Sequence, residues 1–83
     1  MNIEVYGKPD CPFCSLAKDL LNRKGLHYSE HVAGSDMTRE EFFEKFPGAR
    51  TVPQITIDGR LIGGYDKLTE WMNSYDNSKF LAG

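Results

Sequence analysis

Long apolar runs are missing from the sequence, which has no stretch near the ~20 residues of a membrane-spanning helix. It also lacks an excess of positive charge, since 10 Lys and Arg stand against 12 Asp and Glu, for a formal net charge of -2. Without a basic field to hold a phosphate backbone, we expect no nucleic-acid partner. The N-terminal stretch is unlike a secretory signal, because Glu4 stands where cationic and then apolar residues would be needed. We therefore expect a soluble cytoplasmic protein with no membrane contact.

Cysteine is scarce as well, since Cys11 and Cys14 are the chain's 2 cysteines. Cytosolic thiols are kept reduced, so redox chemistry explains this pair better than a structural disulfide does. One alternative is half of a zinc site, but tetrahedral zinc needs about four protein ligands. A second C-x-x-C is absent, and the remaining ligand candidates are His27, His31 and scattered acids. We therefore expect no metal. The other alternative is a buried pair of inert thiols, which the intervening Pro12 and the predicted helix start disfavour.

The rest of the composition is that of an ordinary globular protein, with 40% hydrophobic and 27% charged residues among 83. A chain of this length holds one compact domain at most. No internal repeat is visible. We expect the domain to span 1–76, and 77–83, where the sequence shows no clear period, to form a loosely ordered tail.

The first third of the chain predicts a strand followed by a helix. Residues 2–6 alternate with the period of a strand that buries at least one face, and 7–10 end it. Pro12 suits the first turn of a helix, and Gly25 is a stop signal. Apolar residues recur between them on one helical face: Phe13, Leu16, Ala17, Leu20 and Leu21.

The middle of the chain predicts a second strand and a second helix. Residues 27–32 can form a strand parallel to the first, with the right-handed connection that such crossovers almost always have. Thr38 and Glu41 have the spacing of a capping box. A short helix should therefore follow Thr38 and end near 47–48.

The last third predicts a hairpin and a third helix. Residues 52–57 alternate, and Asp58-Gly59 is a two-residue turn signal leading to 60–62. Asp66 can cap a helix that carries apolar residues at Leu68, Trp71, Met72 and Tyr75. The predicted order is β-α-β-α-β-β-α, an α/β fold with the two cysteines directly after the first strand.

This position predicts different roles for the two cysteines. A thiolate attacks disulfides, whereas an ordinary cysteine, with a pKa of about 8.5, is mostly protonated at neutral pH. The helix N-terminus favours an anion at Cys11, and Lys8 adds a positive charge, while Asp10 opposes both. Cys14 lies inside the first turn, where the helix should shield it more. We therefore predict that Cys11 is the nucleophile and Cys14 the resolving thiol.

Four features together resemble the glutaredoxins, small members of the thioredoxin fold, across roughly 1–75. Lys8, two residues and then Cys-Pro-Phe-Cys at 11–14 match the family pattern of lysine followed by C-P-[YF]-C. Thr-Val-Pro-Gln-Ile at 51–55 matches T-V-P-x-[IV], and Gly-Gly-Tyr-Asp at 63–66 matches a glycine pair with a following acid. The order of the elements is the fourth match.

The resemblance implies a thioredoxin fold, a four-stranded mixed sheet flanked by three helices, and a groove beside Cys11 that holds glutathione. Val52 would offer its backbone to the cysteinyl part of the tripeptide, and Pro53 would be cis. Asp66 would hold the γ-glutamyl end, and Lys8 would face the glycyl carboxylate as well as the thiolate. The implied glutathione-binding set is Lys8, Phe13, Thr51, Val52, Pro53, Gly64, Tyr65 and Asp66.

Two residues depart from the family pattern. Many relatives carry a glutamine on the second helix that helps to bind the glycyl carboxylate, and the ungapped register places Glu40 there. Because an acid would repel that carboxylate, the neighbouring Arg39 is the candidate that would serve instead. Phe13 replaces the commoner tyrosine and keeps the ring.

By this resemblance the chain is a monomeric enzyme that reduces protein disulfides and glutathione mixed disulfides. Glutathione would be its reducing co-substrate, with no permanently bound cofactor, and a ribonucleotide reductase is one acceptor that family analogy suggests. One rival is a thioredoxin-like or glutaredoxin-like reductant served by a flavin reductase, which Lys8, Asp66 and the absence of W-C-G-P-C disfavour. The other is a module that holds an iron-sulfur cluster between two subunits. Pro12 disfavours it, because cluster-holding members usually carry a smaller residue there.

Overall fold

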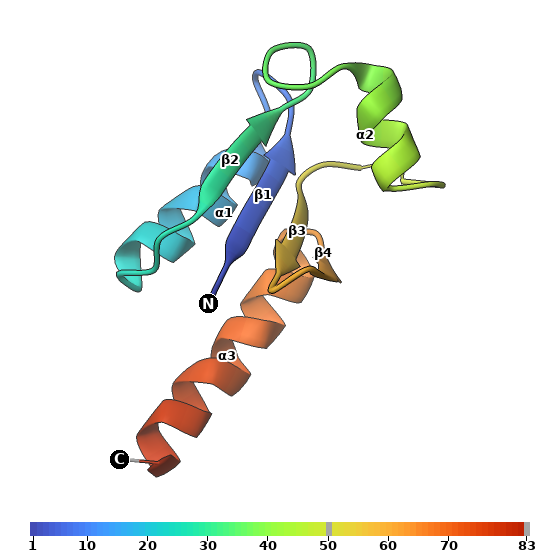
Figure 1. Cartoon of the computed structure of the whole chain (residues 1–83). Coiled ribbons are helices and arrows are strands. Elements are labelled where there is room, and N and C mark those ends of the chain that lie inside the picture. The colour runs from blue at the N-terminus through green and yellow to red at the C-terminus, as the bar shows by residue number, and fades with distance from the viewer. Residues whose placement is uncertain (50, 83) are drawn as a thin grey trace.

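A computed structural model describes the backbone of residues 1–49 and 51–82 and the side chains as far as Tyr75. Strands and helices follow in the order that the sequence predicts (Figure 1). They are β1 (Ile3–Gly7), α1 (Pro12–Arg23), β2 (Ser29–Val32), α2 (Arg39–Lys45), β3 (Gln54–Ile57), β4 (Arg60–Gly63) and α3 (Tyr65–Ala82).

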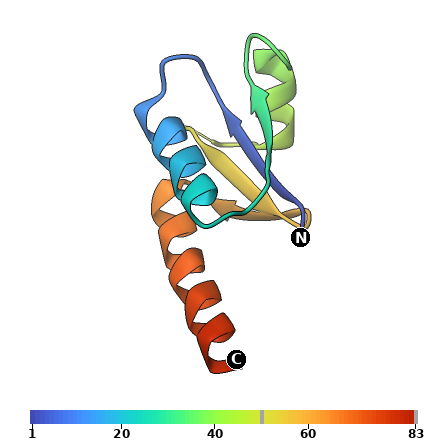
Figure 2. The same cartoon turned by 90° about the vertical axis from the view of Figure 1, so that its left-hand side faces the viewer.

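The four strands form one mixed sheet in the order β2-β1-β3-β4. β1 pairs parallel with β2 and antiparallel with β3, and β3 pairs antiparallel with β4. Helices α1 and α3 cover one face of the sheet, and α2 lies on the other (Figure 2). The predicted α/β thioredoxin fold, with a four-stranded mixed sheet and three helices, is therefore confirmed.

The main core lies between the sheet and the pair α1 and α3. The strand period turns Ile3 and Val5 toward this side, where both are almost fully buried. They pack with residues from all the neighbouring elements: Ala17, Leu21, Ile55, Ile57, Leu68 and Met72. This packing fixes the start of α1 at the end of β1, which is where the two cysteines lie.

A second, smaller core holds α2 against the opposite face. Tyr6 points to this side and packs with Phe42 and Phe46. The helix begins with the predicted capping box, in which the Glu41 N–H donates to Thr38 Oγ1 and the Thr38 N–H donates to Glu41 Oε1. Hydrogen bonding to the Glu41 carboxyl, first from the backbone N–H of Thr38 and then from its side chain, lowers the pKa of that carboxyl. The packing of Phe42 and Phe46 on Tyr6 holds α2 beside the C-terminal end of β1.

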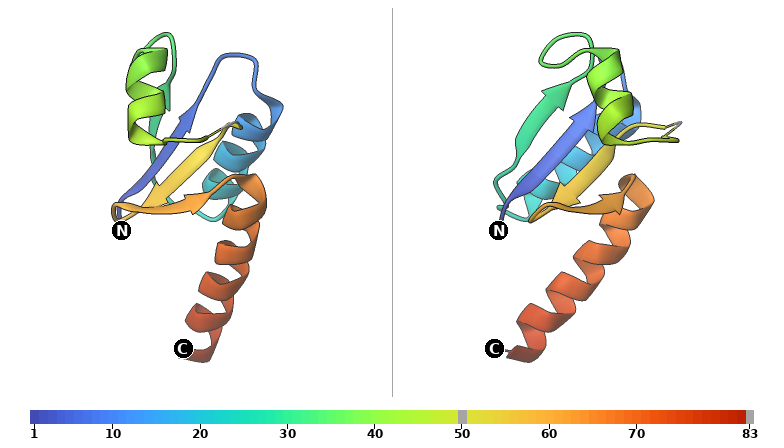
Figure 3. Two further views of the ribbon diagram at one scale, coloured as in Figure 1. Left: turned by 90° about the vertical axis from the view of Figure 1, so that its right-hand side faces the viewer. Right: turned by 45° about the vertical axis from the view of Figure 1, so that its right-hand side comes forward.

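Two expectations about α3 are wrong. Asp66 is not its cap, because the helix already begins at Tyr65 and Asp66 lies in its first turn. The backbone of 77–82 is helical, where a loose tail was expected, and the helix extends beyond the sheet (Figure 3). The sequence has no proline or glycine between Asp66 and Gly83, so no residue there stops a helix that the core has already started. Gly83 lies outside the described residues.

Tyr6 is expected to make the stability of this α2 face pH-dependent. Burial, and then the nearby Glu4 carboxylate, raise the pKa of the Tyr6 hydroxyl above its ordinary 10.0. The folded state therefore keeps the Tyr6 proton to a higher pH than the unfolded chain does. The free energy of unfolding falls as the pH rises above 10, because the unfolded chain then loses this proton first. Urea unfolding between about pH 9 and 11 should show a shallower fall for Tyr6→Phe than for the wild type. Tyr28→Phe is the matched control, and an equal change in both variants would contradict this assignment.

Candidate active site

Cys11 caps helix α1. It has extended backbone, with φ -107° and ψ 106°, and Pro12 occupies the first helical position. The Cys14 N–H donates a hydrogen bond to Cys11 Sγ at 3.1 Å. No acidic residue lies in the first turn of α1, and Asp10 is exposed in the loop before it. This local arrangement favours negative charge on Cys11 Sγ, as the sequence predicts.

The two cysteines are joined by a disulfide, with their Cα atoms 5.2 Å apart. Both residues are buried, with exposed fractions of 8% for Cys11 and 5% for Cys14. The sequence leads one to expect a larger difference between them. Burial alone therefore does not separate their roles, whereas the cap and the cleft described below do.

Gly7, the last residue of β1, is a residue that the sequence reasoning missed. A Cβ at this position would lie 2.6 Å from Cys14 Sγ, closer than side-chain atoms normally approach. The absence of a side chain lets the strand pass directly beside Cys14. The signal was a glycine inside a strand, which often marks a close approach of the backbone.

A cleft of about 1040 Å³ opens beside Cys11. It lies between α2, the segment before β3 and residues 8–11, which join β1 to α1 and are called the active-site loop below. Cys11 lines it, but Cys14 does not. Two cations, Lys8 and Arg39, and the carboxylate of Asp10 are also in its wall. Among the expected site residues, those lining the cleft are Lys8, Cys11, Phe13, Arg39, Thr51 and Val52. The structure therefore brings the loop, α2 and Val52 to one thiol-bearing surface.

α2 presents Arg39 to this cleft, whereas Glu40 is absent from the described lining. The register of the helix is set by Phe42 and Phe46, which are one turn apart and both buried against Tyr6. Of these two neighbours, Arg39 is therefore the one that lines the described cleft.

The segment leading into β3 is braced by a side chain that the sequence reasoning did not single out. Gln54 Nε2 donates to the Thr51 carbonyl oxygen at 2.9 Å. The Val52–Pro53 peptide bond is cis, as the family resemblance implies. Pro53 itself is buried, so Thr51 and Val52 are the residues of this segment that face the cleft.

Gly64, Tyr65 and Asp66 are not part of the described lining of the cleft. Gly64 lies beside Pro53, and Tyr65 lies beside Phe13. A Cβ on Gly64 would be 3.5 Å from the Pro53 carbonyl oxygen. The Tyr65 ring lies 6.2 Å from the Phe13 ring, centroid to centroid. Tyr65, the first residue of α3, therefore lies next to Phe13 of the cleft wall. Asp66 follows it and is exposed.

Two aromatic residues of α2 that the sequence analysis did not single out, Phe42 and Phe43, line the cleft. Phe42 is buried, whereas Phe43 is 54% exposed. The helix is only 7 residues long and one of its faces already carries Phe42 and Phe46. Since consecutive helical residues point about 100° apart, Phe43 could not share that face. This spacing was the signal for an exposed ring.

Within the described part of the chain, no three His, Cys, Asp or Glu residues are grouped so as to hold a metal ion. His31 instead stacks on Tyr6 with ring centroids 4.5 Å apart, and its Nε2 lies 3.2 Å from Glu4 Oε1. Over the same residues, no helix has both the length and the apolar character needed to cross a membrane.

The fold and the site together define a thioredoxin-fold protein with a dithiol/disulfide pair at the start of its first helix. The glutaredoxin family model matches residues 3–62. Glutaredoxin 3 of Escherichia coli is 46% identical over 68 residues, which are 81% of each chain. The chain belongs to the glutaredoxin family, whose members are thiol-disulfide oxidoreductases.

Other relatives agree with this assignment. The hybrid peroxiredoxin hyPrx5 of Haemophilus influenzae is 43% identical over 84% of this chain, which spans 29% of that protein. Glutaredoxin 1 from Francisella tularensis, solved with cacodylate, superposes with a TM-score of 0.78 at 25% identity, covering 92% of this chain and 96% of that one. A buckwheat glutaredoxin, solved with glutathione, superposes with a TM-score of 0.72 at 29% identity, covering 87% and 68%.

Proposed function

We propose that this protein uses glutathione to reduce protein disulfides and glutathione mixed disulfides, with Cys11 as nucleophile. The observation that carries the proposal is the composition of the cleft. Cys11 lines it without Cys14, and Lys8 and Arg39 place two positive charges in the same wall. A cysteine-containing peptide with free carboxylates is the kind of ligand that such a surface suits.

The proposed reaction is thiol-disulfide exchange in two steps. The Cys11 thiolate attacks a substrate disulfide, forms a mixed disulfide and releases one substrate thiolate, which takes a proton from solvent. Cys14 then attacks Cys11 Sγ and expels the second substrate thiol. Because displacement at sulfur is in line, the expelled group leaves on the side of Cys11 away from Cys14. The cleft lies where Cys11 is accessible and Cys14 is not, which fits that direction.

Glutathione would lie across the cleft with its glycyl end toward the two cations. Lys8 and Arg39 would meet the glycyl carboxylate, and the backbone of Val52 would meet the cysteinyl part. The γ-glutamyl end would reach the start of α3, where a helix N-terminus favours a carboxylate. Phe13, Thr51, Pro53, Gly64, Tyr65 and Asp66 complete the proposed surface, with the Asp66 carboxylate facing the ammonium group.

Glutathione should reduce the Cys11–Cys14 disulfide directly. Oxidised protein mixed with millimolar glutathione, with samples quenched in acid and alkylated, should gain two alkyl groups by mass spectrometry. NADPH with a flavin thioredoxin reductase should not produce this change. Rapid reduction by the flavin enzyme together with failure of glutathione would overturn the proposed electron source while leaving the dithiol chemistry intact.

Removing either cation from the cleft should weaken glutathione binding. Lys8→Gln and Arg39→Gln should each raise the KM for glutathione about threefold to fivefold, the upper range for an exposed ion pair. Initial rates against glutathione concentration measure this. Glu40→Gln is the matched control, because Glu40 adjoins Arg39 but is not part of the described wall, and it should change KM less than about twofold. A larger effect from Glu40→Gln would favour the ungapped register.

The remaining expectations concern partners and compartment. The site we propose needs reduced glutathione, which suits the reducing cytoplasm. None of the described lining residues selects a ribonucleotide reductase over another disulfide protein, so that acceptor stays a prediction. The monomeric state is likewise a prediction. Colourless protein after anaerobic purification would count against an iron-sulfur cluster.

A further inference from the structure

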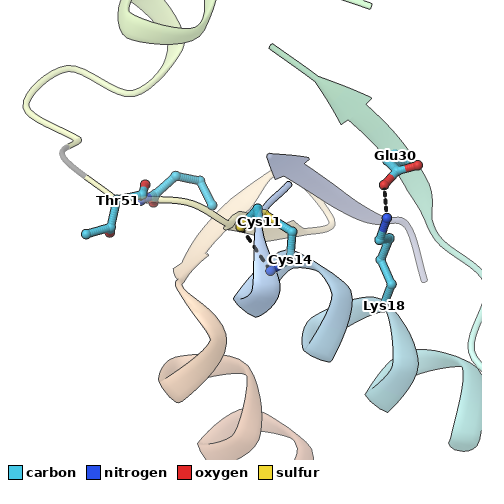
Figure 4. The surroundings of a disulfide bond; sticks show 6 residues. Cys11, Cys14, Lys18, Glu30 and Thr51 are labelled. Atoms are coloured by element: carbon cyan, nitrogen blue, oxygen red, sulfur yellow. Dashed lines mark hydrogen bonds and ion pairs between the residues drawn. A yellow bond between two sulfur atoms is a disulfide. The ribbon is translucent and has the colours of Figure 1, made fainter. Parts of the chain in front are cut away.

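A second groove, of about 650 Å³, opens beside the disulfide between the active-site loop, α1 and β2. Unlike the first cleft, it is lined by both cysteines. In Figure 4, Thr51 of the first cleft lies on one side of the disulfide, and Lys18 and Glu30 lie on the other. The charged residues that line the second groove are Lys8 and Asp10 from the loop, Lys18 from α1 and Glu30 from β2.

Lys18 is the cation of this groove that belongs with Cys14. It follows Cys14 by four residues on α1, so the two side chains project from the same side of the helix, one turn apart. Its Nζ forms an ion pair with the carboxylate of Glu30 on β2. The side chains of Lys18 and Glu30 are 30% and 41% exposed, so this charge pair is partly shielded from solvent.

The start of α1 stabilises negative charge on Cys11 rather than on Cys14. A cation beside Cys14 would therefore be the group that stabilises its thiolate. The N–H of Cys14 itself donates to Cys11 Sγ. When the disulfide is reduced, a thiolate attacks Cys11 Sγ, the bond between the two cysteines breaks, and Cys14 leaves with the electron pair. The quality of a leaving thiolate sets the rate of this step, and a nearby cation improves it.

Building on the proposed function, we propose that Lys18, held across the second groove by Glu30, stabilises the Cys14 thiolate as it leaves. The reductant's thiolate sulfur bonds to Cys11 Sγ, and Cys14 takes up a proton from solvent after its charge has been stabilised. A second reductant thiolate then attacks the reductant sulfur and restores the Cys11 thiolate. The sum is one disulfide and two thiols converted into two protein thiols and one reductant disulfide.

Neutralising Lys18 should therefore slow reduction of the disulfide. With dithiothreitol as reductant, Lys18→Met should react about fivefold more slowly than the wild type. Lys18→Arg keeps the charge and should react within about twofold of the wild type. Arg23→Met is the matched control, because Arg23 pairs with Asp19 on the same helix but lines neither groove, and its rate should not change. Quenching in acid, alkylation and mass spectrometry give the rates.

Two further measurements separate this role from a structural one. Glu30→Gln removes an acid from the groove and should accelerate reduction, the opposite sign to Lys18→Met. In about 1 M salt, where the Debye length is ~3 Å, the Lys18→Met effect should shrink. Equal rates for Lys18→Met and the wild type, or slowing by both variants, would overturn the proposal.

The monothiol background gives the final test. In Cys14→Ser, adding Lys18→Met should not alter the rate of removing glutathione from a glutathionylated peptide, since no Cys14 thiolate forms. An equal slowing there would show that Lys18 acts through the fold or the first cleft. The rate measurement uses dithiothreitol and not glutathione. If glutathione failed as reductant, the proposed function would be wrong, but the Lys18 proposal would still be tested by the dithiothreitol rates.

Discussion

Cys11→Ser is expected to abolish both activities, the reduction of protein disulfides and the removal of glutathione from mixed disulfides. A serine hydroxyl is not ionised at neutral pH, and Cys11 is the cysteine that both caps α1 and lines the first cleft. Loss of the nucleophile should reduce the rate by at least about 10³-fold, to the level without enzyme. A coupled assay with glutathione reductase and a glutathionylated peptide measures it.

The control for this variant is the fold. Cys11 and Cys14 are not among the residues that pack in the main core. The far-ultraviolet circular dichroism of Cys11→Ser should therefore match that of the reduced wild type. Residual activity above about a tenth of the wild type in a folded variant would show that Cys14 can act as the first nucleophile.

Cys14→Ser should separate the two activities. Removal of glutathione from a peptide needs only Cys11, because a second glutathione can resolve the mixed disulfide, so the rate should stay within about threefold of the wild type. Reduction of a protein disulfide relies on internal attack by Cys14 and should fall below about a tenth. Insulin reduction and peptide deglutathionylation, measured on the same preparation, test the two expectations.

The trapped intermediate gives an independent reading of the same variant. Mass spectrometry of Cys14→Ser after exposure to a protein disulfide should show the substrate attached at Cys11. If Cys14→Ser were inactive in both assays while Cys11→Ser retained activity, the two roles would have to be exchanged.

Local signals predicted the elements that hold the site. The spacing of Thr38 and Glu41 predicted a capping box, and the structure contains both hydrogen bonds. Pro12 after Cys11 predicted the start of α1, and the structure places Cys11 as its cap. These features depend on residues within one turn of each other, so neighbours in sequence suffice to determine them. The end of α3 was missed because nothing local stops that helix before Gly83.

The faces of α2 needed packing to decide. Sequence register alone placed Glu40 toward the glycyl carboxylate and did not single out Phe43. In the structure, Phe42 and Phe46 pack against Tyr6, and this orients Arg39 and Phe43 to the cleft. A helix of 7 residues has too few apolar positions for its period to define its buried face unaided.

What the sequence by itself determined is the order of the elements, the capped start of α1 and the identity of the two reacting sulfurs. Tertiary structure decided which of those sulfurs faces the first cleft and which charges surround each one. Lys18 and Glu30 are 12 residues apart and meet only because the parallel crossover brings β2 beside α1. Such a pairing depends on the path of the whole chain between them, and no local pattern in the sequence records it.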